Sequence, residues 1–267
     1  MTDSELTISE SEGILTAVLN RVGKHNAING VMLEGLSSAV RRFATCKDLR
    51  VFLIRAEGSR YFSSGADVSE MPREITAGPS EFRHIYKSGP MSFHGLGDEL
   101  EAVEKPVVVA HQATCLGGAL ELSLSCDFRL AAQRTRYGLP EIGMGMIPGS
   151  GGTSRLTRLI GPHWARWLIM ANKQIDAAQA LAMGLVHQVY ADDEFEARTW
   201  EFCQHLAAQP PEVLAAAKLA IELSVDLDRQ QARNVERLTA STLYAGLEHR
   251  GLMVALLAKL SGDKRGS

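Results

Sequence analysis

The stretch "CLGGALELSLSCDFRL", residues 115–130, decides the fold, because it places a glycine turn between a strand and a helix. Residues 107–110, just before it, are apolar and mostly β-branched, which is typical of a buried strand. Residues 116–118 then form the expected turn, and residues 119–125 the first turns of a helix. The one charged residue at the start of this helix is Glu121.

This junction of turn and helix can bind a negatively charged group. The first N–H groups of a helix have no partner within the helix and carry partial positive charge. Glycine has no Cβ atom, so another molecule can approach the backbone closely. Glu121 would lie near whatever the N–H of Gly118 contacts. An acidic residue in a first turn can equally serve only to complement the helix dipole, so the junction alone leaves both interpretations open.

Further strands and helices on either side of this stretch predict an α/β fold. Short apolar runs with β-branched residues predict strands at residues 14–19 and 51–54. Between them, residues 31–43 carry apolar side chains three and four positions apart, which is the spacing of an amphipathic helix, at Leu33, Leu36, Val40 and Phe43. Strands that alternate with helices indicate an α/β architecture.

The C-terminal part of the chain has a different character. Residues 212–223 and 230–260 are rich in Ala, Leu, Glu, Lys and Arg, which favours helices. Pro211 suits the first position of a helix, where its missing N–H would have had no partner. We therefore expect two regions, a core over residues 1–198 and a helical region over residues 199–267.

Composition and charge narrow the class of protein. Of the 267 residues, 45% are hydrophobic and 22% charged, as is usual for a globular protein, and the net charge is -3. No block of Lys or Arg provides the positive surface that nucleic acid or anionic lipid requires, so we expect neither as a partner. No apolar run approaches the ~18 residues of a membrane span. Residues 1–13 resemble neither a secretory signal nor a transit peptide, so we expect a cytoplasmic protein that binds no membrane.

The cysteines and histidines do not predict a metal site. The four cysteines contain no CxxC pair, which disfavours zinc and a disulfide framework and fits reduced thiols in the core. None of the eight histidines forms an HExxH or comparable ligand pair. We therefore expect no metal, and free thiols at Cys46, Cys115, Cys126 and Cys203.

Two further glycine turns lie on either side of the central stretch. The first, in "YFSSGADVSEM" at residues 61–71, places Gly65 and Ala66 before Asp67 and Ser69, either of which could cap a helix. Many α/β turns use such residues, so this motif is weak by itself.

The second turn lies in "YGLPEIGMGMIPGSGGTSRLTRLIG", residues 137–161. Glu141 follows a proline and precedes an apolar residue there, where a carboxylate is either exposed or functional. Residues 149–152 resemble a phosphate-binding loop but lack the Gly-Lys-Ser/Thr of a P-loop. Ser150 lacks the GxSxG spacing of a hydrolase nucleophile. No GxGxxG follows a strand, so no dinucleotide site is predicted.

These motifs occur together with a fourth, "AQALAMGLVHQVY" at residues 178–190. The order and spacing of "SSGADVSEM", "CLGGALELSLSCD", the motif around Glu141 and this fourth motif resemble the enoyl-CoA hydratase/isomerase family, the crotonases. The resemblance implies a crotonase-like (ClpP/crotonase) α/β fold, a spiral of ββα units followed by a C-terminal helical trimerisation region. It also implies a homotrimer, or a hexamer built as a dimer of trimers.

The resemblance also implies a chemistry. In crotonases two backbone N–H groups form an oxyanion hole for the carbonyl oxygen of an acyl-CoA thioester, and the matching positions here are Ala66 and Gly118. The two catalytic glutamates that flank the substrate double bond in hydratases correspond to Glu121 and Glu141. Coenzyme A then enters as part of the substrate, and no separate cofactor is expected. Adjacent carboxylates repel as anions, so one should hold a proton, and the sequence leaves open which one.

The presence of both glutamates favours hydration, since isomerases of the family generally lack the first. The resemblance thus implies a 2-enoyl-CoA hydratase, a lyase of fatty acid or related acyl-CoA breakdown. The alternatives are an isomerase or hydratase-lyase of the same family, or a catalytically silent homologue that binds CoA esters or RNA. The substrate-binding residues that the resemblance implies are Ala66, Asp67, Val68 and Ser69, which would contact the CoA portion, and Gly118.

The chain departs from the family pattern beside the predicted oxyanion hole. His111, Gln112 and Ala113 replace the usual Val-Asn-Gly, and Ala119 replaces a third glycine. The donor at Gly118 is kept, but Ala119 adds a methyl group beside it. The length and substituents of the acyl group therefore stay open.

Overall fold

The structure, a computed structural model, describes residues 4–70, 78–88 and 92–263. Contacts divide the chain into two units, residues 1–207 and 208–267. Helix α7 (Phe195–Ala207) packs on the sheet of the first unit, so the division that we expected after residue 198 falls inside this helix.

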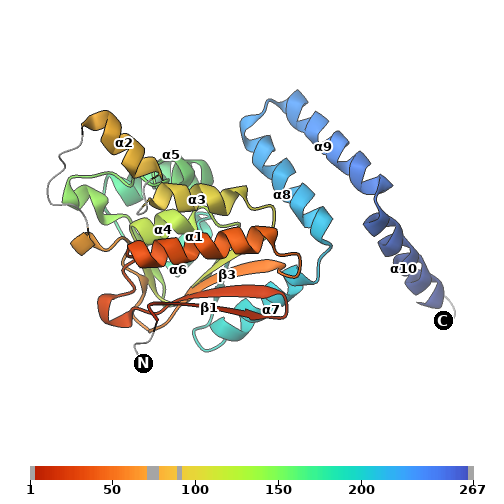
Figure 1. The fold of residues 1–267 in the computed structure, drawn as a ribbon, viewed down its shortest axis with the longest axis horizontal. Coiled ribbons are helices and arrows are strands. Elements are labelled where there is room, and N and C mark those ends of the chain that lie inside the picture. Colours follow the sequence, from red (N-terminus) through yellow and green to blue (C-terminus); the bar gives the residue numbers. More distant parts are fainter. Residues whose placement is uncertain (1–3, 71–77, 89–91, 264–267) are drawn as a thin grey trace. The chain divides into compact units, whose positions relative to one another are not determined.

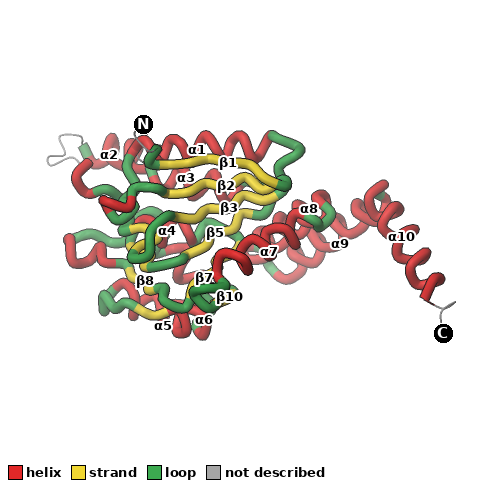
Figure 2. The backbone as a smooth tube through the Cα atoms, turned by 90° about the horizontal axis from the view of Figure 1, so that it is seen from below, coloured by secondary structure: helices red, strands yellow, loops and turns green. Residues whose placement is uncertain are grey.

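Six strands form the main sheet of the first unit (Figure 2). Their order is β1-β2-β3-β5-β7-β10, and neighbours are parallel except β1 and β2. The predicted strands are confirmed as β2 (Ile14–Leu19), β3 (Val51–Ala56) and β5 (Val107–His111). The others are β1 (Leu6–Ser11), β7 (Phe128–Ala132) and β10 (Gln188–Tyr190). The inner strands are mostly apolar and buried on both faces, as is typical of parallel strands covered on both sides.

The helices of the first unit lie between its strands along the chain, except α7, which follows the last strand, β10. Besides α7 they are α1 (Gly30–Thr45), α2 (Pro79–Ser88), α3 (Phe93–Ala102), α4 (Gly118–Ser123), α5 (Ser154–Ile169) and α6 (Ala177–Ala182), with short 3-10 turns η1 (Val22–Lys24), η2 (Val68–Glu70) and η3 (Pro140–Met144). The predicted amphipathic helix is confirmed as α1, whose buried face includes Leu33, Leu36, Val40 and Phe43. It begins at Asn29, whose side chain accepts a hydrogen bond from the N–H of Met32 at 2.9 Å.

Each face of the main sheet has its own apolar core, because side chains alternate along the strands. Leu15 and Phe52 belong to one core, which α1 and α3 cover. Ile14 and Leu53 belong to the other, which α7 covers. Figure 1 shows α1 and α3 on one side of the sheet and α7 on the opposite side.

A second, smaller sheet has the order β4-β6-β8-β9. Its strands are β4 (Tyr61–Ser63), β6 (Thr114–Leu116), β8 (Arg136–Gly138) and β9 (Ile175–Asp176). Each of β4, β6 and β8 follows a strand of the main sheet along the chain, and each is followed by a helix or a 3-10 turn. This repeated order of long strand, short strand and helix is the predicted spiral of ββα units.

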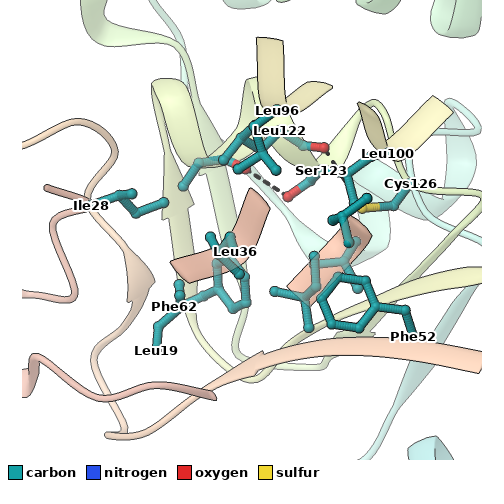
Figure 3. Close-up of a pocket in the computed structure, with 14 residues that line it drawn as sticks. Leu19, Ile28, Leu36, Phe52, Phe62, Leu96, Leu100, Leu122, Ser123 and Cys126 are labelled. Atoms are coloured by element: carbon teal, nitrogen blue, oxygen red, sulfur yellow. Dashed lines mark hydrogen bonds between the residues drawn. The ribbon is translucent and has the colours of Figure 1, made fainter. Parts of the chain in front are cut away.

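The inner side of α4 closes a small apolar cavity in the first core (Figure 3). The cavity measures about 20 Å³, which is room for about one water molecule. Leu96, Leu100 and Leu122 line it, and its one hydroxyl, that of Ser123, already donates to the carbonyl oxygen of Ala119 at 2.7 Å. It is therefore a gap in core packing and too small for a substrate.

The second unit contains α8 (Pro211–Asp226), α9 (Arg229–Ala245) and α10 (Leu247–Asp263), so the helical tail is confirmed. The helical pattern over residues 230–260 is divided in two, because the backbone is extended at Gly246. Neither α8 nor α9 buries a side chain, and large apolar residues such as Ile221 and Leu238 are exposed. Among the described residues, no helix is long and apolar enough to cross a membrane.

Candidate active site

Three turns that carry predicted site residues follow the strands of the second sheet. β4, β6 and β8 run parallel, so their carboxyl ends lie at one edge, where parallel sheets usually place their ligands. β4 leads to Gly65 and Ala66, β6 leads to Gly117 and Gly118, and β8 leads to Glu141 in η3. The topology thus gathers motifs that lie far apart in the sequence.

Gly65 lets the first two turns touch. A Cβ atom placed on Gly65 would lie 3.0 Å from the carbonyl oxygen of Leu116 and 3.1 Å from the nitrogen of Gly118, closer than side chains normally approach backbone. Its φ of 98° is also one that other residues rarely adopt. Only glycine fits this position without moving the turns apart.

The amides of Ala66 and Gly118 have no hydrogen-bond partner in the part of the chain that the structure describes. Ile28 forms a parallel bridge with Ala66 by bonding to the residues on either side of it: the N–H of Ile28 donates to Gly65 and the N–H of Asp67 donates to Ile28. The N–H of Ala66 therefore points away from Ile28. Gly118 is the first residue of α4, so its N–H has no partner within the helix. Within the described chain neither amide donates a hydrogen bond, and two such donors on touching turns can hold one anionic oxygen.

The residues after Ala66 hold the turn in place. The carboxylate of Asp67 accepts from the guanidinium of Arg21 at 2.5 Å and from the hydroxyl and N–H of Ser69 at 2.6 and 3.0 Å. The bonds from Ser69 and then Arg21 lower the pKa of Asp67 to about 2. Val68 is 60% exposed. The side chain of Asp67 is thus occupied within the protein, and Val68 lies at the surface with Ser69.

Glu121 is anchored to a different turn. It is 5% exposed, and its Oε1 accepts hydrogen bonds from the N–H groups of Ser150 at 2.6 Å and Gly152 at 3.0 Å. A Cβ atom on Gly152 would lie 2.9 Å from this oxygen, so glycine is needed for the approach. Burial raises the pKa of Glu121 above its usual value, and the two N–H groups and the charge of Arg155 oppose this rise without cancelling it. The bonds favour the carboxylate form.

Glu141 has the opposite environment. It is 7% exposed, its Oε1 lies beside Gly117, and its buried Oε2 makes no hydrogen bond within the part of the chain that the structure describes. Burial raises its pKa from 4.5 to about 7, with a smaller contribution from the charge of Glu121, although a hydrogen bond from its own backbone N–H acts to lower it. Near neutral pH this carboxyl group therefore holds a proton about half of the time and has an oxygen free for a substrate.

The structure also identifies site residues that the motifs alone did not. The ring of Phe93 packs against Gly118, about 3 Å from where its Cβ would be. The turn at residues 149–152 binds an anion, as its glycines suggested, but that anion is the side chain of Glu121 and no phosphate is needed. The glycine spacing was a usable signal for this turn, whereas nothing in the sequence pointed to Phe93.

His111, one of the departures from the family pattern, lies in the core beneath α4 and not in the site. Its Nδ1 lies 3.1 Å from the Tyr137 hydroxyl and its Nε2 2.9 Å from the Ser123 hydroxyl. Ser123 already donates to Ala119, so His111 donates from Nε2 and accepts from Tyr137, an arrangement in which each of these donors has an acceptor. Burial, and then the charge of Arg129, lower the pKa of His111 to about 3, so it stays neutral.

A family model described as enoyl-CoA hydratase/isomerase matches residues 9–254. The chain belongs to the enoyl-CoA hydratase/isomerase family. It is 32% identical to 2,3-dehydroadipyl-CoA hydratase of Escherichia coli (strain K12) over 98% of this chain and 99% of that protein. It is 31% identical to short-chain-enoyl-CoA hydratase of Clostridium acetobutylicum over 94% of each chain.

Solved structures agree with this family assignment. The crystal structure of enoyl-CoA hydratase from Bacillus anthracis matches with a TM-score of 0.87 and 28% identity, and the match covers 96% of this chain and 97% of that one. An enoyl-CoA hydratase structure from Geobacillus kaustophilus also matches with a TM-score of 0.87, at 29% identity and 96% coverage of each chain. The predicted crotonase-like fold is therefore confirmed. Members of the enoyl-CoA hydratase/isomerase family act on acyl-CoA thioesters, which suits paired amide donors.

Proposed function

We propose that this protein is a 2-enoyl-CoA hydratase, which adds water across the C2–C3 double bond of an enoyl-CoA thioester. The observation that carries the proposal is the pairing of two free amides with two buried glutamates of unlike environment. Relatives that are about 30% identical over nearly the whole chain are named hydratases, which supports the same activity here.

In the proposed reaction the amides of Ala66 and Gly118 hold the thioester oxygen. As water adds at C3, negative charge develops on this oxygen, and the enolate is stabilised by donors that are already in position. Loss of one such donor typically costs about 3–4 kcal/mol of transition-state stabilisation. The donors are backbone groups on touching turns, which limits how far they can move.

The two glutamates move the protons. Glu121, held as a carboxylate by Ser150 and Gly152, takes a proton from water as the new bond from oxygen to C3 forms. Glu141, with its pKa near 7, gives its proton to C2 as the enolate returns to a thioester. The net change is the gain of one water by the substrate. Proton exchange with solvent restores both carboxyl groups, and the only cofactor chemistry is that of the CoA carried by the substrate.

A second candidate is an isomerase that moves the double bond. A carboxyl group with a pKa near 7 and one unpartnered oxygen could take a proton from one carbon and return it to another, and Glu141 has both properties. Glu121 favours hydration over this alternative, because an isomerase has no need of a second buried carboxylate at the site.

The product mass separates these candidates. The purified protein is mixed with a panel of short, medium and aromatic enoyl-CoA thioesters, and the products are identified by mass spectrometry. A gain of one water supports a hydratase, and an unchanged mass with a shifted double bond supports an isomerase. Binding of the thioesters without any product would indicate a catalytically silent homologue and would contradict the proposal.

We also propose that the protein assembles as a homotrimer or as a dimer of trimers. Large apolar side chains are exposed on η3, on the residues after it and on α5, with which η3 is in contact; among them are Met144, Ile147, Trp164, Trp167 and Met170. Such a concentration is typical of a surface that another chain covers. Light scattering of the purified protein should give the mass of three or six chains, and a single-chain mass would contradict this assembly.

A further inference from the structure

Arg155 occupies an unfavourable place for a cation. It is the second residue of α5, where the N-terminus of the helix carries partial positive charge. Its side chain is nonetheless mostly buried, at 15% exposure. A buried cation at this end of a helix requires specific partners. The partners of Arg155 indicate which parts of the protein it connects.

The guanidinium of Arg155 links α3 to the turn that anchors Glu121. Its Nε and Nη2 donate to the two carboxylate oxygens of Glu101 at 2.5 and 2.7 Å, and Nη2 also donates to Asp98 at 2.8 Å. Its Nη1 donates to the carbonyl oxygen of Ser150 at 3.3 Å. The N–H of Ser150 in turn donates to Glu121. One residue of the turn thus connects Arg155 to Glu121.

Two glycines make room for this guanidinium. A Cβ atom on Gly151 would lie 2.2 Å from Nη1, and one on Gly97 would lie 3.2 Å from it. The backbone N–H of Arg155 also donates to the carbonyl oxygen of Gly151 at 2.8 Å. The arginine therefore contacts the turn through its side chain and through its backbone. A planar group held by a bidentate pair cannot be replaced by the flexible single amine of lysine.

We propose that Arg155 is a positioning residue, which fixes the turn at residues 149–152 so that its amides hold Glu121 ready to deprotonate water. This inference rests on the proposed hydratase function. Arg155 acts through Ser150 and does not touch the reacting atoms. The carboxylates of Asp98 and Glu101 hold the arginine against α3.

The charges around Glu121 support this role. Arg155 faces it from α5 and lowers its pKa, while Glu141 faces it from η3. Asp98 and Glu101 of α3 face the arginine itself. Removal of the arginine charge should therefore raise the pKa of Glu121, and a base must be deprotonated to act.

The test compares Arg155→Gln, which removes both the positive charge and the bidentate guanidinium, with Arg155→Lys, which keeps the charge alone. We expect both variants to lose about 10- to 100-fold in kcat, because a shifted catalytic group costs this much, with little change in KM. The acidic limb of the kcat profile should move to higher pH in Arg155→Gln and stay near the wild-type position in Arg155→Lys. The control is Arg41→Gln, which removes another arginine pair to α3, the 3.1 Å pair with Glu99, and should keep the wild-type kcat and profile.

The outcomes separate this inference from the proposed function. If wild-type protein hydrates enoyl-CoA and both Arg155 variants keep its kcat and pH profile, Arg155 does not position Glu121. If Arg155→Gln does not fold, the kcat of Arg155→Lys tests the inference instead, and a wild-type kcat in that variant would overturn it. If the wild type hydrates none of the thioesters, the proposed function fails, and carboxyl carbon NMR titration then tests Arg155 without turnover. The Glu121 signal, assigned with Glu121→Gln, should titrate at higher pH in Arg155→Gln and near the wild-type pH in Arg155→Lys, and unchanged titration in Arg155→Gln would overturn the inference.

Discussion

Glu121 and Glu141 are the same type of residue, and both are less than a tenth exposed, yet their side chains differ in their hydrogen-bond partners. Glu121 accepts two backbone hydrogen bonds from the turn at residues 149–152, whereas one oxygen of Glu141 has none within the described chain. Burial raises both pKa values, and backbone hydrogen bonds to the charged form oppose it in both, from Ser150 and Gly152 for Glu121 and from its own backbone for Glu141. In the proposed mechanism the difference teaches that the two amides of this turn favour Glu121 as the base, and that the unpartnered oxygen of Glu141 favours it as the acid.

The strongest test of this difference between the two glutamates is to remove each carboxyl group in turn. We expect Glu121→Gln and Glu141→Gln each to lower kcat by about 10²- to 10⁴-fold, the usual contribution of a general acid or base. Glutamine keeps the size of glutamate, and its oxygen can still accept from Ser150 and Gly152, so binding of an unreactive acyl-CoA should change little. Steady-state kinetics and calorimetric titration provide the two measurements. Near-normal turnover in either variant would show that its assigned role is wrong.

The next prediction tests the oxyanion hole that both glutamates serve. In Gly65→Ala the added carbon would lie about 3 Å from backbone atoms of the α4 turn, so the two amide donors should separate. We expect kcat to fall about 10²- to 10³-fold, the cost of one misplaced donor. Gly23→Ala is the matched control, since nothing lies within 4 Å of its added carbon, and it should keep wild-type turnover. Equal activity in the two variants would contradict the proposed hole.

The pH dependence of kcat sharpens the comparison further. Glu141 must be protonated to donate, and its pKa is about 7, so kcat should fall about tenfold between pH 6 and pH 8. His111 does not contribute to this limb, because its pKa is about 3. Turnover of a saturating substrate measured at constant ionic strength gives the profile. A kcat that rises through this pH range would show that a group acting as a base limits turnover, and would contradict the role of Glu141 as the acid.

The smallest expected effect is on stability. The folded-state pKa of Glu141 is raised, so its neutral form contributes stability that is complete below pH 4.5 and is lost as the pH rises through about 7. Glu141→Gln cannot ionise, so it should melt a few degrees above the wild type at pH 8, and this difference should shrink toward pH 5. Thermal melts at both pH values measure it. A variant that melts lower than the wild type by the same amount at both pH values would contradict the expected loss of stability on ionisation of Glu141.

Much of the fold could be predicted from local pattern. The buried strands and α1 followed from apolar runs and from spacing by three and four, which depend on near neighbours in the chain. The division of the tail at Gly246 was missed, because its composition favours helix on both sides and a single glycine does not by itself end a helix. The family motifs identified the turns that carry the site residues. Their meeting at one edge of the second sheet became visible only in the strand topology.

The electrostatics of the site could not be predicted in the same way. Which glutamate holds the proton depends on hydrogen bonds from Ser150 and Gly152, which lie some thirty positions from Glu121 along the chain. The sequence shows the glycines of this turn but not which anion the turn binds. Arg155 was missed for the same reason, since its role depends on Glu101 of another helix. Long-range partners of this kind carry no local pattern.

The contact between the Gly65 and Gly118 turns has a consequence for how such an enzyme can diversify. The spacing of the two amides is set by main-chain atoms and by the bridge to Ile28, so exchange of neighbouring side chains leaves it in place. In the proposed site, exchange of a side chain that packs on these turns, such as Phe93 against Gly118, would then alter which acyl groups are accepted while recognition of the thioester carbonyl is inherited unchanged.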